Sequence, residues 1–168
     1  YYNVKHLQDY FQKENTIPKF YFIVDRLDLL KQAKTEFINR GLSVNIVNSK
    51  QEFVSDIKKA SALHNSSGNN EITVVNIQKF SEESSSEAIN DYDINIQRVY
   101  FLDEVHRSYN PKGSFLSNLI NSDKNAIIIG LTGTPLITKN LYSKDLFGDY
   151  IHKYYYNASI ADGYTLRL

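Results

Sequence analysis

The sequence predicts an α/β domain with a mainly parallel sheet between helices. Two observations lead to this fold class: short apolar segments of strand length recur along the chain, and amphipathic helical patterns separate them. Strands that are apolar on both faces are typical of a parallel sheet covered by helices on both sides. Hydrophobic residues make up 42% and charged residues 23% of the 168 residues, a composition ordinary for one globular domain.

Five strands and three intervening helices are expected in order along the chain. The strands are runs rich in β-branched and aromatic residues, at residues 20–24, 44–47, 72–75, 98–102 and 126–131. Apolar residues at helical spacing place the helices at residues 27–38, 53–63 and 115–120. Gly41 ends the first helix, and the Ser-, Asn- and Gly-containing segment 65–70 ends the second. The acidic, serine-rich segment 81–93 is expected to be a surface excursion.

Composition excludes several classes of site. The chain has no cysteine, which removes disulfides, thiolate metal sites and cysteine nucleophiles and is consistent with a cytoplasmic protein. No apolar run is long enough to cross a bilayer. The 19 basic and 19 acidic residues balance, so net charge gives no support for binding to nucleic acid.

Polar residues end four of the predicted strands, and they point to the site. They are Asp25, Asn76, Asp103 and Thr132. Ligands in open α/β sheets bind at the carboxyl ends of the strands. The most informative segment runs Asp103-Glu104-Val105-His106, where an apolar strand delivers two adjacent carboxylates and then a histidine. ATP hydrolysis needs a carboxylate near the metal and a group that activates water. The alternative is two acids at a strand end with a histidine as a local hydrogen-bond partner.

A second motif, Thr132-Gly133-Thr134-Pro135, follows the next strand. Small hydroxyl residues beside a glycine allow close backbone approach and hydrogen bonding to a carboxylate or ligand. Alone, this motif more often marks an ordinary turn. Its place one strand after Asp103 gives it weight.

Together these motifs resemble superfamily 2 helicases and translocases, with 103–106 similar to the DEAH-type motif II and 132–135 similar to motif III. The particular residues of these two motifs, together with the following Arg107-Ser108 and Leu136, resemble the R subunits of type I restriction enzymes. Further similar segments are 24–26 (motif Ia), 73–80, 154–156 and 160–163. The resemblance runs from about Phe20 to the C-terminus.

The resemblance implies a three-layer RecA-like motor domain of the P-loop NTPase type that hydrolyses Mg²⁺-ATP to move double-stranded DNA. It also implies methyltransferase and specificity subunits as partners, and an endonuclease as the parent enzyme. Asp103 would bind Mg²⁺ and Glu104 would be the catalytic base. His106 would couple the nucleotide site to Thr132 and Thr134. Residues contacting DNA would be Arg26, Gln78 and Lys79. Without the family, a surface ion pair is the simpler interpretation of Arg26, and the assignments of Gln78 and Lys79 have no firmer independent support. Val105 departs from the alanine common in the family.

The sequence carries no Gly-x-x-x-x-Gly-Lys-[Ser/Thr] loop, which cradles the phosphates of ATP in such motors. We expect this loop upstream of Tyr1, so that Leu7, Tyr10 and Phe11 lie in or just after the helix it opens. Residues 1–150 would then form an N-terminally truncated first motor domain, and residues 151–168 the start of the linker to a second. We expect these 168 residues alone to hydrolyse ATP negligibly.

Two other functions remain open. Another superfamily 2 motor, such as a type III restriction subunit, is disfavoured by Arg107-Ser108 and the tyrosine-rich C-terminal segment. A degenerate, non-catalytic DNA-binding or docking domain is disfavoured by the intact pair of Asp103 and Glu104.

Overall fold

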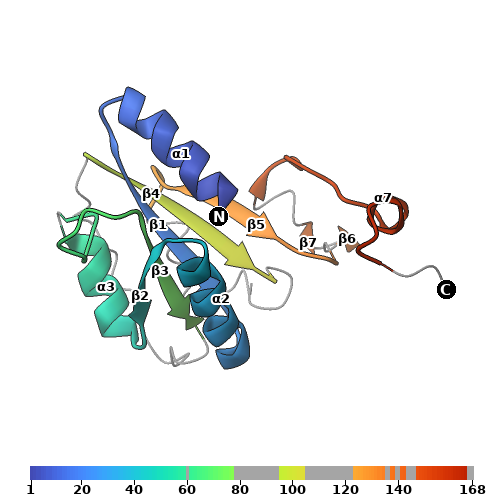
Figure 1. Ribbon diagram of the computed structural model, residues 1–168, viewed down its shortest axis with the longest axis horizontal. Coiled ribbons are helices and arrows are strands. Elements are labelled where there is room, and N and C mark those ends of the chain that lie inside the picture. The colour runs from blue at the N-terminus through green and yellow to red at the C-terminus, as the bar shows by residue number, and fades with distance from the viewer. Residues whose placement is uncertain are drawn as a thin grey trace. The chain divides into compact units, whose positions relative to one another are not determined.

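The computed structural model describes residues 1–59, 61–77, 95–104, 123–134 and 147–165, together with the backbone of 137–138 and 141–142. Its contacts divide the chain into two compact units, Tyr1–Pro135 and Leu136–Leu168. The first unit holds the sheet and its helices, and Figure 1 shows its arrangement. The predicted boundary near residue 150 stays a prediction.

The first unit is built on a five-stranded sheet in the order β2-β3-β1-β4-β5. The strands are β1 (Ile17–Val24), β2 (Ser43–Val47), β3 (Glu71–Asn76), β4 (Ile96–Asp103) and β5 (Ile127–Leu131). All four neighbouring pairs are parallel. The predicted α/β fold with a parallel sheet is confirmed, and each of the five predicted strands forms within a few residues of its expected bounds.

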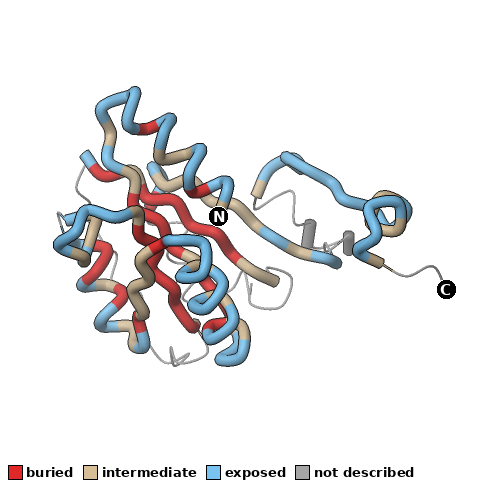
Figure 2. Tube along the Cα trace, viewed as in Figure 1, coloured by how far each residue is buried: buried red, intermediate tan, exposed pale blue. Residues whose placement is uncertain are grey.

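Among the helices that the structure describes, α1 and α2 cover one face of this sheet. Helix α1 (Tyr2–Lys13) places Val4 and Phe11 in a core cluster with Phe20 of β1 and with residues of β3 and β4. Helix α2 (Leu27–Asn39) places Leu30 against Val24 and Val74. Figure 2 shows the buried residues concentrated along the central strands, as expected for strands covered on both faces.

Helix α3 (Lys50–Lys58) covers the opposite face. Its Phe53 is fully buried and meets the Tyr21 ring edge-on, and Tyr21 in turn stacks on Tyr100 of β4. Alternation along a strand explains the two faces, because Phe20 and Tyr21 of β1 point to opposite sides. Ser49 begins α3 as a helix cap, its hydroxyl accepting from the Glu52 amide at 3.2 Å.

The prediction that this helix continues to Leu63 is wrong, because α3 ends at Lys58. The backbone is already extended at Lys59, with φ −68° and ψ 132°. The Lys19 ammonium from β1 donates to the Asp56 carbonyl at 2.7 Å and to the Ser61 carbonyl at 3.1 Å. A buried cation therefore takes up carbonyl oxygens that a continuing helix would use for itself. The predicted helix at 115–120 and the surface segment 81–93 lie outside the described residues.

The second unit contains a two-stranded antiparallel pair, β6 (Ile137–Thr138) and β7 (Leu141–Tyr142), and the short helix α7 (Tyr156–Ala161). The Tyr154 hydroxyl donates to the Asp162 carboxylate at 2.8 Å, and so closes the turn around α7. Within the described parts of the chain, no helix is both long and apolar enough to cross a membrane.

Candidate nucleotide site at the carboxyl edge of the sheet

Because all five strands run in the same direction, their carboxyl ends lie along one edge of the sheet. Asp103 is the last residue of β4 and pairs with Leu131, the last residue of β5. On the other side of β4, Ile23 pairs with Leu102, so β1 ends beside Asp103 as well. The carboxyl ends of three adjacent strands, β1, β4 and β5, therefore lie side by side at this edge, and Asp103 ends the middle strand, β4.

Asp103 and Glu104 form the centre of this edge. Both are half-buried, and the Asp103 carboxylate accepts a hydrogen bond from the Glu104 backbone N–H at 3.1 Å. Glu104 has a φ of 51°, in the left-handed region that non-glycine residues rarely occupy. Such a conformation costs on the order of 1 kcal/mol and is frequent at functional sites.

Asp25 directly follows β1 and adds a third carboxylate to the same edge. Its Oδ1 is buried and has no hydrogen-bond partner in the part of the chain that the structure describes. Burial raises the pKa of Asp103, and the negative charges of Glu104 and then Asp25 raise it further, against the hydrogen bond from the Glu104 amide. Glu104 and Asp25 therefore both repel a negative charge on Asp103, and a cation at this edge would relieve both that repulsion and the desolvation of Asp103.

Thr132 follows β5 on the other side of Asp103. Its hydroxyl accepts a hydrogen bond from the Thr134 backbone N–H at 3.1 Å, which forms a compact turn at the strand end. Thr132 is half-buried and Thr134 is exposed. Arg26, next to Asp25, is exposed at the N-terminal cap of α2, where its backbone is extended.

Three of the predicted site residues, His106, Gln78 and Lys79, lie outside the described residues. Of the others, the structure brings Asp103, Glu104, Thr132 and Thr134 to one edge and places Arg26 at the end of the adjacent strand. Asp25 was expected at a strand end but without a role, and sequence alone does not show that one of its carboxylate oxygens is buried at the end of the strand beside β4. The described residues contain no group of three His, Cys, Asp or Glu side chains arranged to hold a metal.

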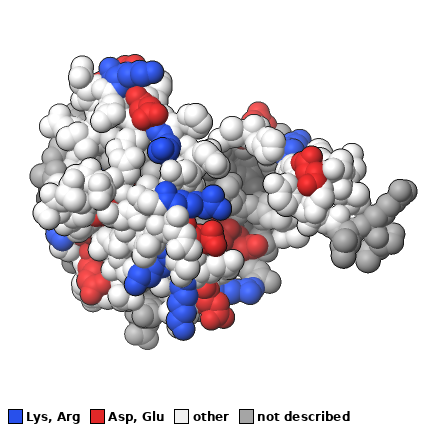
Figure 3. Space-filling model, viewed as in Figure 1, with Lys and Arg blue, Asp and Glu red and all other residues white. Residues whose placement is uncertain are grey.

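Charge is mixed on the face of the molecule that Figure 3 presents. On the first unit, Lys and Arg side chains are interspersed with Asp and Glu. This distribution agrees with the net charge of zero and differs from the continuous basic face that drives non-specific binding to DNA.

Comparison with known proteins identifies the family. The family model described as SWI2/SNF2 ATPase matches residues 2–168. The chain belongs to the SWI2/SNF2 ATPase family. The RecA-like architecture implied by the motifs is that of this family's ATPase domain, and the five-stranded parallel sheet between helices is consistent with it.

Curated relatives of this SWI2/SNF2 ATPase chain are endonuclease subunits of type I restriction enzymes. One from Staphylococcus saprophyticus is 31% identical over 163 residues, covering 92% of this chain and 16% of the relative. Two putative ones from Methanocaldococcus jannaschii are 30% and 29% identical, covering 85% and 99% of this chain and 13% and 18% of the relatives. The chain thus spans less than a fifth of the length of these relatives. The resemblance predicted from motifs II and III is confirmed.

Proposed function

We propose that this chain is the ATP-hydrolysing motor domain of a type I restriction endonuclease R subunit, in which hydrolysis of Mg²⁺-ATP drives translocation of double-stranded DNA before cleavage. The observation that carries the proposal is the pair of adjacent carboxylates, Asp103 and Glu104, at the carboxyl end of a central parallel strand. In open α/β sheets this is the edge at which nucleotides bind. The family match and the restriction-enzyme relatives support the same proposal.

The carboxyl edge fits a divalent cation in two respects. The buried Asp25 Oδ1 has no hydrogen-bond partner among the described residues, and the pKa of Asp103 is raised by burial and by the neighbouring acids. Mg²⁺ usually keeps several waters and binds proteins through only one or two carboxylates, with substrate phosphates completing its shell. Asp103, assisted by Asp25, would therefore be sufficient to hold it. When bound, Mg²⁺ would neutralise charge on the β- and γ-phosphates.

Glu104 would act as the base that accepts the proton of the attacking water. Its left-handed backbone, rare for a non-glycine residue, is the kind of local strain that often accompanies a functional role. Thr132 and Thr134, on the neighbouring strand end, would sense the nucleotide together with His106. Arg26 would contact a DNA phosphate, with Gln78 and Lys79 as further DNA contacts.

The partners in this proposal are double-stranded DNA and the methyltransferase and specificity subunits of a restriction complex, acting in the cytoplasm. Sequence recognition would then belong to the specificity subunit. This division of labour agrees with the balanced charge of the domain, because the motor need not bind DNA tightly without its partners.

The test is ATP hydrolysis by the intact natural polypeptide with its partner subunits and target-bearing DNA, since the 168 residues carry no phosphate-binding loop. Glu104→Gln retains the size and hydrogen bonding of the side chain but removes the base. We expect DNA-dependent hydrolysis to fall at least a hundredfold while ATP still binds. Glu36→Gln is the matched control, because Glu36 is an exposed residue of α2 whose carboxylate forms a surface ion pair with Arg40.

Either of two results would reject this function. Hydrolysis that is absent from the intact complex favours the non-catalytic docking domain, and hydrolysis that survives Glu104→Gln removes the proposed role of the carboxylate pair. Hydrolysis stimulated by single-stranded DNA or without the specificity subunit would instead favour another superfamily 2 motor.

A further inference from the structure

A second cluster of charged side chains lies at the opposite, amino-terminal end of the sheet. It joins Lys19 and Tyr21 of β1, Asp56 of α3, His64 of the segment after α3, and Glu71, the first residue of β3. The side chains of Lys19, Asp56 and Glu71 are only 2%, 3% and 4% exposed, whereas that of His64 is 26% exposed. Three charged side chains that are almost fully buried thus surround His64, which is partly accessible to solvent.

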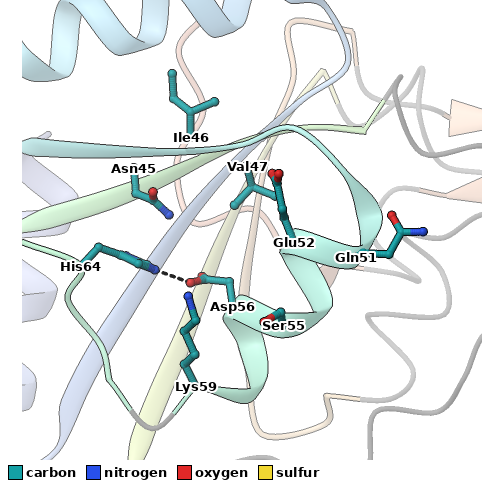
Figure 4. Close-up of a pocket in the computed structure, with 9 residues that line it drawn as sticks. All are labelled: Asn45, Ile46, Val47, Gln51, Glu52, Ser55, Asp56, Lys59 and His64. Carbon is teal, nitrogen blue, oxygen red and sulfur yellow. Dashed lines mark hydrogen bonds and ion pairs between the residues drawn. The ribbon is translucent and has the colours of Figure 1, made fainter.

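Asp56 is the hub of the cluster. Its Oδ2 accepts from the Tyr21 hydroxyl at 2.9 Å and lies 3.3 Å from the Lys19 ammonium. Its Oδ1 faces His64 Nε2, as Figure 4 shows, in a short contact. Burial lowers the pKa of Lys19, and the attraction of Asp56 opposes that shift. Asp56 therefore needs a donor on each of its oxygens to compensate its own desolvation.

His64 bridges two carboxylates. While Nε2 faces Asp56, Nδ1 lies 2.5 Å from Glu71 Oε1. A neutral imidazole has one N–H and one lone pair, so one nitrogen would then face a carboxylate oxygen without a proton between them. Only the imidazolium donates to both acids. With that charge the cluster is neutral: Lys19 and His64 are positive, and Asp56 and Glu71 are negative.

Glu71 also holds the backbone of the segment that carries His64. Its carboxylate accepts from the His64 amide at 3.0 Å, from the Asn65 amide at 3.1 Å and from Asn65 Nδ2 at 2.9 Å. Burial alone would raise the pKa of Glu71, but the hydrogen bonds from Asn65 and His64 outweigh it and lower the pKa below its ordinary value of 4.5. Glu71 consequently remains ionised throughout the range in which a histidine titrates.

We propose that His64 is a proton-dependent clamp: its imidazolium ties α3 to β3 and holds the segment 61–70 on the sheet, and loss of its proton to solvent releases that segment. When the imidazole is neutral, Asp56 and Glu71 share one buried cation, Lys19, in place of two. The segment contributes the Ser61 carbonyl to Lys19, so its departure exposes the ammonium to water. The protonated clamp is intact at acidic pH and opens as the pH rises.

The other charged groups near His64 do not alter this direction. Lys59, at the end of α3, and Glu52, in its first turn, line with His64 an open pocket of about 440 Å³ beside β2. Both are exposed, and they carry opposite charges, so their electrostatic effects on His64 oppose each other. From β2 itself the pocket receives only the uncharged Asn45, Ile46 and Val47. Neither Lys59 nor Glu52 therefore reverses the direction in which the proposed clamp responds to pH.

Hydrogen exchange of the intact natural polypeptide, followed by mass spectrometry, tests the clamp. The quantity is the protection factor of peptides covering 61–70, measured at about pH 5.5 and 8.5, on either side of the ordinary histidine pKa of about 6.5. The His64 and Asn65 amides report directly because both donate to Glu71. We expect their protection to be about tenfold lower at the higher pH, the change that one charge-assisted hydrogen bond produces. Protection of 72–75 in β3 should change less than about twofold.

Two variants separate the clamp from other effects of pH. His64→Gln cannot become charged, so protection of 61–70 should be low at both pH values. His6→Gln removes an exposed histidine of α1 and should behave like the wild type. A wild-type segment whose protection is independent of pH, or a His64→Gln protein that keeps the wild-type response, overturns the proposal.

The exchange of the imidazole C2 hydrogen gives the titration of His64 in the wild type, independently of any variant. Its midpoint should coincide with the loss of amide protection. If His64 titrates over a range in which the protection of 61–70 stays constant, the proton does not control the segment. ATP hydrolysis has no part in these readouts, so they stand apart from the proposed function.

Discussion

Replacement of Arg98 by methionine tests the buried ion pair that ties β4 to the segment preceding β5. Arg98 Nε lies 2.5 Å from Asp123 Oδ2, and Nη2 lies 3.2 Å from Oδ1, so the pair is bidentate. The Tyr100 hydroxyl also donates to Asp123 Oδ2 at 3.1 Å. The two charged side chains are 3% and 1% exposed. Since β4 ends in Asp103, this pair supports the strand that carries the candidate site.

The expected magnitude follows from what the substitution leaves behind. Methionine matches the aliphatic part of arginine, but Asp123 stays buried without its cation. Breaking a buried pair in this way costs about 3–5 kcal/mol. For a domain of this size the loss corresponds to a melting temperature lower by roughly 10–20 °C. The double variant Arg98→Met/Asp123→Leu removes both charges and should recover at least half of that loss, because hydrophobic replacements of buried pairs are often neutral.

Differential scanning calorimetry of the intact natural polypeptide measures the effect on the transition of this domain. Glu36→Gln, which removes an exposed pair with Arg40, serves as the reference and should shift the transition by less than about 3 °C. A loss below about 1 kcal/mol in Arg98→Met would show that solvent or another group compensates Asp123. A double variant no more stable than the single one would show that the pair is not the source of the loss.

Three further substitutions test the edges of the sheet. Glu104→Gly removes the cost of a left-handed residue and should raise the melting temperature by about 3 °C while abolishing ATP hydrolysis; a lower melting temperature would contradict the backbone argument. Asp25→Asn should weaken Mn²⁺ binding in the presence of nucleotide about tenfold by titration calorimetry, whereas Asp28→Asn, in the exposed first turn of α2, should not. Glu71, whose pKa is lowered in the fold, should contribute stability above its ordinary pKa of 4.5 that is lost as the pH falls below it. In melting temperatures measured over a series of pH values, Glu71→Gln should weaken the decrease seen below pH 4.5. A decrease as steep as in the wild type would show that other acidic groups cause it.

The sheet was predictable because its strands are apolar on both faces. Runs such as 72–75 and 98–102 have few polar residues to interrupt them, and a strand buried on both sides needs just such a run. The carboxyl edge followed from the same runs, since each ends at a polar residue. The location of Asp103 and Glu104 at the carboxyl end of β4 was therefore predictable from the sequence.

The charged cluster at the other end was not predictable, because its members are far apart in sequence. Lys19 and Asp56 are joined only by the packing of α3 against β1, which no local pattern encodes. The same contact explains why the predicted end of α3 was wrong. Apolar residues continue at helical spacing to Leu63, but the Asp56 carbonyl accepts a hydrogen bond from Lys19. Burial of the Asp25 Oδ1 atom and the left-handed backbone of Glu104 likewise depend on tertiary structure.

The most direct test of the central claim is where nucleotide binds. Hydrogen exchange of the intact complex should be compared with and without Mg²⁺ and a non-hydrolysable ATP analogue. The account predicts increased protection at the carboxyl ends of β1, β4 and β5, in peptides covering 24–26, 103–104 and 132–134, and little change at 61–70. Nucleotide that binds while these strand ends remain as exchangeable as before would contradict the assignment of the site.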